Sequence, residues 1–457
     1  MKISIAAVFA VTTTSSCLLS STDAYFVPTR NAISITSSSG RSSSKTPPSK
    51  SQSSSSTPTM FLEGVSKKQV KAPDTTKLGN LEVPTVGVGT ISWSSDSLTE
   101  LENLELQSLV NTACKSNAAF FDTAERYGSN WKTALGLGWG ETEALTQKLL
   151  TRVPKQEDQS SLLRPIVATK FTPSPWRTTA QSVVDACEES CKRLGVDSLD
   201  LYQIHMPDIV QPFKNSPMFA SKPKDQIYWE GMVECYNRGL VKNIGVCNYG
   251  QTLLLEAKQY LQKKNVPLAS NQIAFSLVGR HNGAQETLDL CNELDIKVLA
   301  FFPFAMGLLT GKYTSEEMTS NVLAQDTLTS LVRSKKTPLE LRDLSKYVTG
   351  DVKSGIPDGG VRPLLQAMEE IAQNRKKTVA QVALNYIIWK GAIPIPGART
   401  SAQVRDNVGA MGWRLSLQEV NQLETAADKL GFGFEGAGFK RTSEKFVGYG
   451  VEKWTLD

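Results

Sequence analysis

Short apolar runs alternate with longer amphipathic runs from about residue 78 to residue 430. The apolar runs have the length of strands and are bounded by turn-forming residues. The longer runs repeat apolar residues at helical spacing, as in Thr179–Leu194, Ile227–Arg238 and Thr252–Lys263. This alternation predicts a parallel sheet with crossover helices. Eight strands are expected, at Val83–Gly89, Ala119–Thr123, Pro165–Lys170, Leu199–His205, Asn243–Asn248, Ala269–Ile273, Ile296–Phe302 and Ala392–Pro396.

Eight such repeats favour a closed (β/α)8 TIM barrel, which we assign to residues 75–432. An open, doubly wound sheet is the alternative, and as a dinucleotide-binding fold it would carry G-x-G-x-x-G after its first strand. Gly87-Val88-Gly89 lacks the third glycine, and Gly136-Leu137-Gly138 does not follow a predicted strand. The missing motif therefore counts against the open sheet.

Two segments interrupt the repeat. A long loop is expected at Pro207–Lys224, after the fourth strand, and a longer polar insertion at residues 313–360. Loops of that length are usually functional or mobile. Two consecutive helices, Val361–Arg375 and Thr378–Lys390, are predicted after the insertion, and residues 433–457 form a C-terminal tail.

The composition is that of an ordinary globular protein. The chain has 457 residues, of which 40% are hydrophobic and 21% charged. Its net charge of +5 is misleading, because residues 1–58 carry five Lys and Arg against one Asp. The remainder is close to neutral, so the chain has no basic patch that would suggest nucleic-acid binding.

Seven cysteines are scattered along the chain. Cys187 and Cys191 lie four residues apart on one predicted helix face, a spacing that metal ligands can use. No second ligand pair accompanies them, so buried thiols are the favoured interpretation and no metal is expected. The pattern suggests a reducing compartment.

The first sixty residues have the composition of a two-part targeting leader that does not fold by itself. Residues 1–30 are similar to a secretory signal, and their apolar stretch is too short to span a bilayer. Residues 31–60 are rich in Ser and Thr and contain no acidic residue, as in transit peptides. At the junction, Asp23–Pro28 resembles the cleavage motif of plastid precursors in diatoms and related algae, in which the aromatic, here Phe26, is decisive. We therefore expect the plastid stroma, with simple secretion as the alternative.

Polar residues end three of the apolar runs. Asp122 stands at the end of the second predicted strand, Lys170 of the third and His205 of the fourth, and Tyr127 lies just beyond Asp122. Barrel enzymes place their chemistry at the carboxyl ends of the strands, so these side chains are expected to meet. A carbonyl oxygen needs a proton as hydride reaches its carbon. Tyr titrates near ~10, and a nearby Lys⁺ would make it a better acid.

Taken singly, each of the four residues has a simpler explanation. Asp122 could cap a helix, Tyr127 could anchor a loop, Lys170 could extend its amine to solvent, and His205 could be a satisfied structural histidine. The motifs that surround the four residues, and the order of those motifs, favour the catalytic interpretation.

Those motifs are Phe121–Gly128, Thr169-Lys170 and Asp200–Pro207. They are similar to FDTAxxYG, a strand ending in TK, and DLYQIHxP of the aldo-keto reductase superfamily. The resemblance implies that Tyr127 is the general acid, that Lys170 lowers its pKa and that Asp122 pairs with Lys170. It also implies that His205 orients the carbonyl and helps to relay the proton.

The resemblance extends to a site for NADPH. Gly245–Tyr249 is similar to the family's GVSNF and Asn271-Gln272 to its NQ, which implies that Asn248 and Gln272 hold the nicotinamide carboxamide. Arg399, beside a predicted helix start, would bind the 2′-phosphate, although an ordinary capped helix explains that stretch equally well. The complete implied set is Thr90, Asp122, Cys247, Asn248, Gln272, Phe301 stacking on the ring, Phe302, Phe304, Gly307, Leu309, Gly397, Arg399, Gln403 and Asn407.

Three features depart from the family pattern. Cys247 replaces a Ser beside the nicotinamide, and Gly397 and Gln403 stand where many members have cations. These changes weaken the expected cofactor contacts, so Arg399 carries more of the phosphate prediction. Met206 replaces the common Trp after the catalytic His, which alters the substrate pocket wall.

Two functions remain open. The first is a plastid NADPH-dependent oxidoreductase of the carbonyl reductase type that acts on small-molecule aldehydes or ketones. The second is an NADPH-binding regulatory protein that senses redox state on this fold with little turnover. The presence of all four catalytic residues favours the enzyme. No motif indicates which carbonyl is reduced or which oligomer forms.

Overall fold

The computed structural model describes residues 75–93, 98–128, 139–154, 164–208, 224–281, 283–312, 347–348, 350–354 and 356–430. All of these belong to one compact unit, residues 68–457. The predicted leader, the predicted tail and most of the predicted insertion lie outside the described residues.

Eight parallel strands form the centre of the molecule, and they neighbour one another in chain order. Hydrogen bonds also join the first of these strands to the last, from Gly87 N to Pro394 O at 2.9 Å and from Gly89 N to Pro396 O at 3.0 Å. The sheet therefore closes into the predicted (β/α)8 barrel. The strands are β3 (Val88–Gly89), β4 (Phe120–Asp122), β5 (Ile166–Phe171), β6 (Leu201–Ile204), β7 (Ile244–Cys247), β8 (Leu268–Ala274), β9 (Lys297–Phe301) and β10 (Ile393–Pro394).

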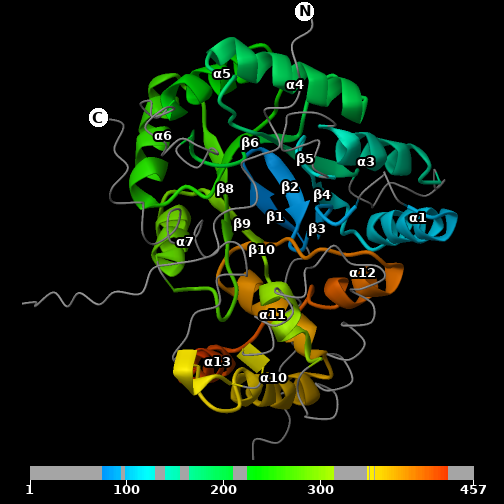
Figure 1. Ribbon diagram of the computed structural model, residues 1–457, viewed down its shortest axis with the longest axis vertical. Coiled ribbons are helices and arrows are strands. Elements are labelled where there is room, and N and C mark those ends of the chain that lie inside the picture. The colour runs from blue at the N-terminus through cyan, green and yellow to red at the C-terminus, as the bar shows by residue number, and fades with distance from the viewer. Residues whose placement is uncertain are drawn as a thin grey trace, which may run out of the picture. The chain divides into compact units, whose positions relative to one another are not determined.

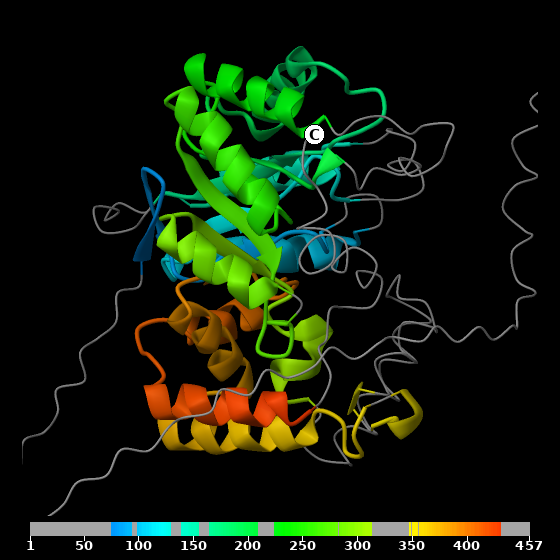
Figure 2. The same ribbon diagram turned by 90° about the vertical axis from the view of Figure 1, so that its left-hand side faces the viewer.

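Helices surround the strands (Figure 1). Two of them, α10 and α13, lie side by side outside α11 (Figures 1 and 2). The helices are α1 (Glu100–Lys115), α3 (Glu141–Thr151), α4 (Ala180–Leu194), α5 (Asp225–Asn237), α6 (Gln251–Lys263), α7 (Ala284–Glu293), α10 (Arg362–Arg375), α11 (Val379–Trp389), α12 (Ser401–Val408) and α13 (Leu417–Asp428), with short 3-10 helices η4 (Ala305–Thr310) and η5 (Val352–Ser354).

The predicted first strand, Val83–Gly89, is wrong in its extent. Its first part belongs to an antiparallel hairpin of β1 (Thr75–Leu78) and β2 (Leu81–Pro84), and only its end forms β3. Pro84 has no N–H to donate, which ends the ladder there and separates the two strands. The hairpin turn places Gly79 at φ +57°, where an added Cβ would lie 2.1 Å from Asn243 Oδ1, so this turn requires glycine.

The hairpin fills one end of the barrel. Leu78 and Val83 are fully buried and belong to the same hydrophobic cluster as Phe120, Ile166 and Leu201, which come from β4 to β6. Figure 2 shows the hairpin at one end of the strands and η4 at the other. The opposite, carboxyl-terminal end is therefore the one left for a site.

Local capping explains where several helices begin. The Thr179 side chain accepts a hydrogen bond from Ser182 N before α4, and Thr378 forms a capping box with Gln381 before α11. The predicted ranges Thr179–Leu194 and Thr378–Lys390 include these caps, so the predicted helices extend one residue beyond the observed ones at the start.

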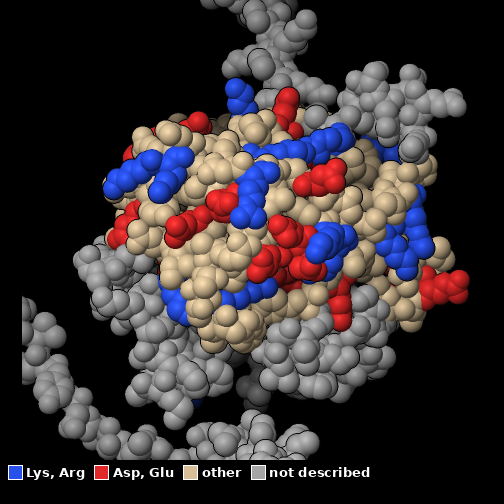
Figure 3. Space-filling view, turned by 90° about the horizontal axis from the view of Figure 1, so that it is seen from above, with Lys and Arg blue, Asp and Glu red and all other residues tan. Residues whose placement is uncertain are grey.

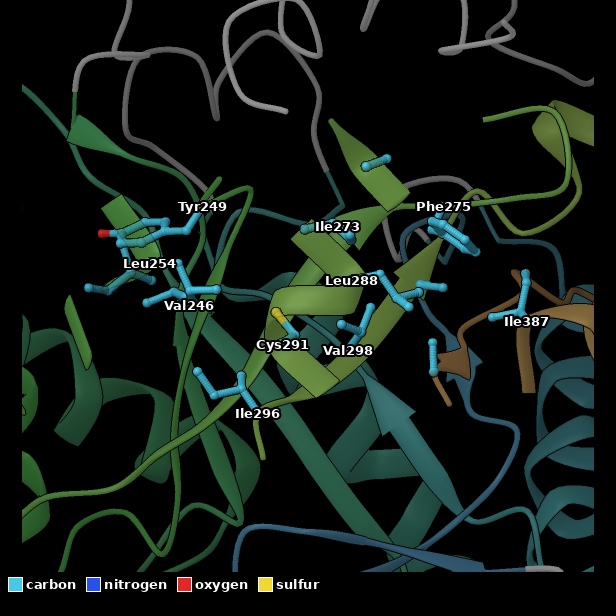
Figure 4. Packing of buried hydrophobic residues seen from close by; sticks show 14 of the residues in the cluster. Val246, Tyr249, Leu254, Ile273, Phe275, Leu288, Cys291, Ile296, Val298 and Ile387 are labelled. Atoms are coloured by element: carbon cyan, nitrogen blue, oxygen red, sulfur yellow. The ribbon is translucent and has the colours of Figure 1, made fainter. Parts of the chain in front are cut away.

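The core between the barrel and its helices consists mainly of apolar side chains. Figure 4 shows Val246, Ile273 and Val298 of β7 to β9 in one cluster with Leu254 of α6 and Leu288 of α7. Each of these side chains is at most 1% exposed. Burial of one such side chain stabilises the folded state by about 1.5–3 kcal/mol relative to leaving it exposed. Near-continuous burial explains why these strands appear in the sequence as unbroken apolar runs.

Within the described residues, no helix combines the length and apolar character needed to cross a bilayer. On the face that lies uppermost in Figure 1, Lys and Arg side chains are interspersed with Asp and Glu (Figure 3). That face therefore presents a mixed surface and not a field of one sign.

Candidate active site

Consecutive strands bring the four predicted catalytic residues to one rim of the barrel. Asp122 ends β4, Lys170 is the fifth of six residues in β5, and His205 follows β6. Asp122 pairs with Ala168 in the sheet. Lys170 lies two residues farther along β5, so its side chain is on the same face of the sheet as that of Ala168. A tight turn, in which Tyr127 N donates to Ala124 O at 3.0 Å, follows β4 and places Tyr127 beside them.

The Lys170 amine is the centre of the site. Its Nζ lies 2.7 Å from Asp122 Oδ2, 3.0 Å from the Tyr127 hydroxyl and 2.8 Å from Thr123 O. An ammonium has three donors, and these three acceptors satisfy all of them. The Lys170 side chain is 0% exposed and that of Asp122 4%, so this is a fully buried ion pair.

Two further contacts hold Asp122 in place. Gln272 Nε2 donates to its second carboxylate oxygen at 2.9 Å, and Thr90 Oγ1 donates to its backbone oxygen at 3.0 Å. Burial disfavours the charge of Lys170, but Asp122 and the Tyr127 oxygen more than offset this and raise its pKa. Lys170 therefore stays charged beside Tyr127.

The effect of Lys170 on the pKa of Tyr127 has the expected direction, but it does not decide the net shift. Burial raises the pKa of Tyr127 to about 12, although Lys170 on its own lowers it. Desolvation of the phenolate therefore outweighs the effect of the nearby cation. Tyr127 is consequently protonated at neutral pH, which is the form that a proton donor must have.

His205 lies against Tyr127, with the ring centroids 5.6 Å apart and the rings at 74°. Burial lowers the pKa of His205 well below its ordinary value, and the positive charges of Lys170 and Arg126 add to that effect. The ring is therefore neutral at physiological pH. A neutral imidazole carries one N–H, which can donate a hydrogen bond to a carbonyl oxygen.

The predicted nicotinamide ligands end the next two strands, and both amides already have protein partners. Asn248 Nδ2 lies 3.3 Å from His205 O, and Gln272 is bonded to Asp122. Asn248 also has φ +62°, which turns the chain at the end of β7. Cys247 is fully buried, and burial raises the pKa of its thiol, so it packs as a small protonated residue.

The predicted pyrophosphate loop divides into two kinds of residue. Phe301 and Phe302 are half-buried at the end of β9, with their ring centroids 5.1 Å apart. Phe304 and Leu309 pack into the hydrophobic core instead, so their side chains hold the loop in place. Gly307, at φ +101°, has open space where a Cβ would stand.

The predicted phosphate site differs from expectation at the start of α12. Gln403 Oε1 accepts hydrogen bonds from Arg399 N and Thr400 N at 2.7 and 3.2 Å, so Gln403 caps the helix. Glu105 Oε1 accepts the Ser401 N–H at 2.8 Å. Most N–H groups at this helix start are already bonded. They therefore cannot contribute to binding an anion, contrary to the expectation from the sequence. Arg399 is exposed beside the capped helix.

Two predicted positions on this side remain consistent with a ligand. Gly397 is exposed and has no atom within 4 Å of an added Cβ, and Asn407 of α12 is 8% exposed. The predicted residues thus form a continuous track along β7 to β10. The open space at Gly307 and Gly397 and the half-buried Phe301 fit an elongated dinucleotide lying on this rim.

Sequence reasoning missed a buried ion pair beside the site. Glu125, 1% exposed, accepts hydrogen bonds from both terminal nitrogens of the Arg177 guanidinium at 2.5 and 3.1 Å and from the Thr172 N–H at 2.6 Å. Arg177 also lies 4.7 Å from the centre of the Trp139 ring. The pair ties the turn that carries Tyr127 to the end of β5. Glu125 lies inside the FDTAxxYG-like motif, and an acidic residue at that position was the feature of the sequence that could have indicated this ion pair.

Among the described residues, no group of three or more His, Cys, Asp and Glu side chains is arranged to hold a metal ion. Cys187 and Cys191 are both buried, as expected for structural thiols.

Comparisons with known proteins agree with this geometry. A model of the aldo/keto reductase family matches residues 85–428. The chloroplastic pyridoxal reductase of Arabidopsis thaliana is 34% identical over 355 residues, which are 77% of this chain and 85% of that protein.

Solved structures share the fold. An aldo-keto reductase of Bombyx mori in complex with NADP aligns with a TM-score of 0.52 and 21% identity, over 78% of this chain and 93% of that one. The glycerol dehydrogenase of Gluconobacter oxydans aligns with a TM-score of 0.57 and 19% identity, over 78% and 96%. Since the family model spans most of the barrel and the plant relative covers most of both chains, the chain belongs to the aldo/keto reductase family.

Proposed function

We propose that this protein is an NADPH-dependent oxidoreductase that reduces aldehyde or ketone carbonyls to alcohols. The observation that carries the proposal is the buried Lys170 amine in contact with both Asp122 and the Tyr127 hydroxyl. The Bombyx mori relative was solved with NADP, and the plant relative is a pyridoxal reductase, which supports both the cofactor and the reaction class.

NADPH, when bound, would supply the hydride that reaches the carbonyl carbon. Tyr127 donates its hydroxyl proton to the carbonyl oxygen, and Lys170 stabilises the phenolate that this leaves. Neutral His205 donates a hydrogen bond to the same oxygen and fixes its orientation. Asn248 and Phe301 would orient the cofactor ring, and the phosphate would lie at Arg399.

The same residues favour turnover over the cofactor-sensing alternative. A binding protein needs the track along β7 to β10, but it does not need a proton donor joined to a buried cation. Tyr127, Lys170 and His205 all meet within the rim where a carbonyl would lie. We therefore retain the enzyme as the proposed function.

A panel of carbonyl compounds tests this proposal directly. The full-length protein is mixed with NADPH and with pyridoxal, small aldehydes or ketones, and loss of NADPH absorbance is followed. We expect turnover of at least one compound, with the alcohol as product. Tight NADPH binding without reduction of any compound would instead indicate the sensing function.

Replacing Arg399 with Ala is expected to weaken NADPH binding by roughly 10- to 100-fold, because a charge-assisted contact to the 2′-phosphate is lost. NADH affinity should change little, since NADH has no such phosphate. Dissociation constants are measured by quenching of protein fluorescence. Arg405→Ala, also an exposed arginine and part of α12, is the matched control. Equal loss for both cofactors would exclude Arg399 as the phosphate ligand.

We also propose delivery to the plastid, as the chloroplastic plant relative suggests. Residues 1–60 fused to a fluorescent protein should reach the plastid of a diatom-like host, and Phe26→Ala should stop the fusion before the innermost membranes. Tyr25→Ala, which changes the neighbouring aromatic, is the control. Imaging against chlorophyll fluorescence measures the outcome. Secretion of the unchanged fusion would support the alternative location.

A further inference from the structure

Arg126 is a half-buried cation at the rim of the candidate site. It stands directly before Tyr127 in the turn after β4. No hydrogen bond or ion pair joins its guanidinium to any of the described residues, whereas the nearby Arg177 is held by both oxygens of Glu125. A half-buried guanidinium loses part of its hydration, and without a partner that loss is not offset.

The carboxylates nearest to Arg126 along the chain are already committed. Glu125 is bonded to Arg177 and to the Thr172 N–H, and Asp122 is bonded to Lys170 and Gln272. Neither of these two carboxylates forms a hydrogen bond or ion pair with Arg126.

The charge of Arg126 reaches the reacting centre. Together with Lys170 it disfavours protonation of His205 and so lowers the pKa of that ring. Burial alone lowers the pKa of Arg126 itself, as expected where no carboxylate lies beside it. Lys170 is paired with Asp122, whereas Arg126 has no carboxylate partner among the described residues.

Two tryptophans lie close to this rim. Trp139 and Trp176 have ring centroids 6.1 Å apart, and Trp176 is 59% exposed. The Arg177 guanidinium lies over the face of the Trp139 ring, 4.7 Å from the ring centre, as in a cation–π interaction. An apolar wall and a cation on the same rim match a molecule with a carbon skeleton and an anionic group.

We propose that Arg126 binds a carboxylate or phosphate group of the substrate, so that this enzyme prefers carbonyl compounds that carry a negative charge. This inference rests on the proposed carbonyl reduction. The reacting oxygen would lie at Tyr127 and His205, and the anionic group at Arg126. A guanidinium can hold either group through two parallel hydrogen bonds.

Two aldehydes that differ only in charge test the inference. The full-length protein with NADPH is assayed with 4-carboxybenzaldehyde and with its neutral methyl ester. Arg126→Gln is expected to lower kcat/KM for the carboxylate by about 10- to 100-fold, mainly through KM, and that for the ester by less than about threefold. Arg126→Lys keeps the charge and should restore part of the loss. Arg238→Gln, an exposed arginine of the α5 C-terminus, is the control that should change neither value.

A binding measurement separates this inference from the proposed reaction. Calorimetry with 4-(hydroxymethyl)benzoate and its methyl ester needs no turnover. Tighter binding of the anion to the unchanged protein, lost in Arg126→Gln, supports the anion site even where no aldehyde is reduced. Equal binding of the anion to both proteins, or equal losses for acid and ester, overturns the inference. Replacing the acid by a phosphate monoester shows which of the two anions is preferred.

Discussion

Tyr127→Phe is expected to lower kcat for carbonyl reduction by roughly 10²- to 10⁴-fold, the usual worth of a general acid. The change removes the hydroxyl that contacts Lys170 at 3.0 Å and keeps the aromatic ring beside His205. Burial raises the pKa of Tyr127 to about 12, so Tyr127 is protonated at neutral pH and the change removes that proton. NADPH affinity should stay close to that of the unchanged protein.

The measurement is steady-state loss of NADPH absorbance with the best compound of the carbonyl panel, accompanied by NADPH titration. Tyr260→Phe is the matched control, since Tyr260 of the outer helix α6 packs against Trp229 of α5. The control should retain full activity. If Tyr127→Phe reduces carbonyls at the normal rate, Tyr127 is not the proton donor.

Asp122→Asn is expected to lower the free energy of unfolding by about 3–5 kcal/mol, besides abolishing most activity. The Lys170 amine is 0% exposed, and Asp122 is the only carboxylate that it contacts among the described residues. Loss of the negative charge leaves a buried ammonium without a counter-ion. The effect should be smaller in the double variant Asp122→Asn with Lys170→Met, because no uncompensated charge then remains.

Urea denaturation measures these differences. The Glu189–Lys192 pair of α4 is a suitable control, because its N–O distance is also 2.7 Å but its side chains are 55% and 70% exposed. Glu189→Gln should change stability far less, since water already solvates both charges. A similar loss for the exposed and the buried pair would contradict the argument from burial. Equal stability of the single and double variants at Asp122 would do so as well.

Local sequence patterns determined the barrel because its repeating unit is local. Each strand of the barrel is a short apolar run, each helix has its own periodicity, and their alternation is visible without knowledge of any contact. The order Asp122, Lys170, His205 followed from the same rule, since the carboxyl ends of parallel strands meet at one rim. The positions implied for catalysis could therefore be placed on that rim from the sequence, together with Tyr127 in the turn beside it.

Tertiary structure decided the features that depend on partners distant in sequence. The turn at Gly79 is matched to Asn243, and the start of α12 is bonded to Glu105 of α1, across 296 residues. No local period carries such a pairing, so the hairpin and the contact with Glu105 were not foreseen. The local cap by Gln403, which the sequence left open as an alternative, and the distant Glu105 together occupy the donors at the start of α12.

The electrostatic character of the site also came only from the folded chain. The sequence motifs imply that Lys170 lies near Tyr127. The sign of the net pKa shift, however, depends on the balance between the Lys170 charge and desolvation of the Tyr127 phenolate. At Tyr127 burial outweighs the charge of Lys170, whereas at His205 burial and the nearby positive charges lower the pKa together. For the same reason the two arginines, Arg126 and Arg177, look alike in sequence. Only packing pairs Arg177 with Glu125 and leaves Arg126 without a carboxylate partner among the described residues.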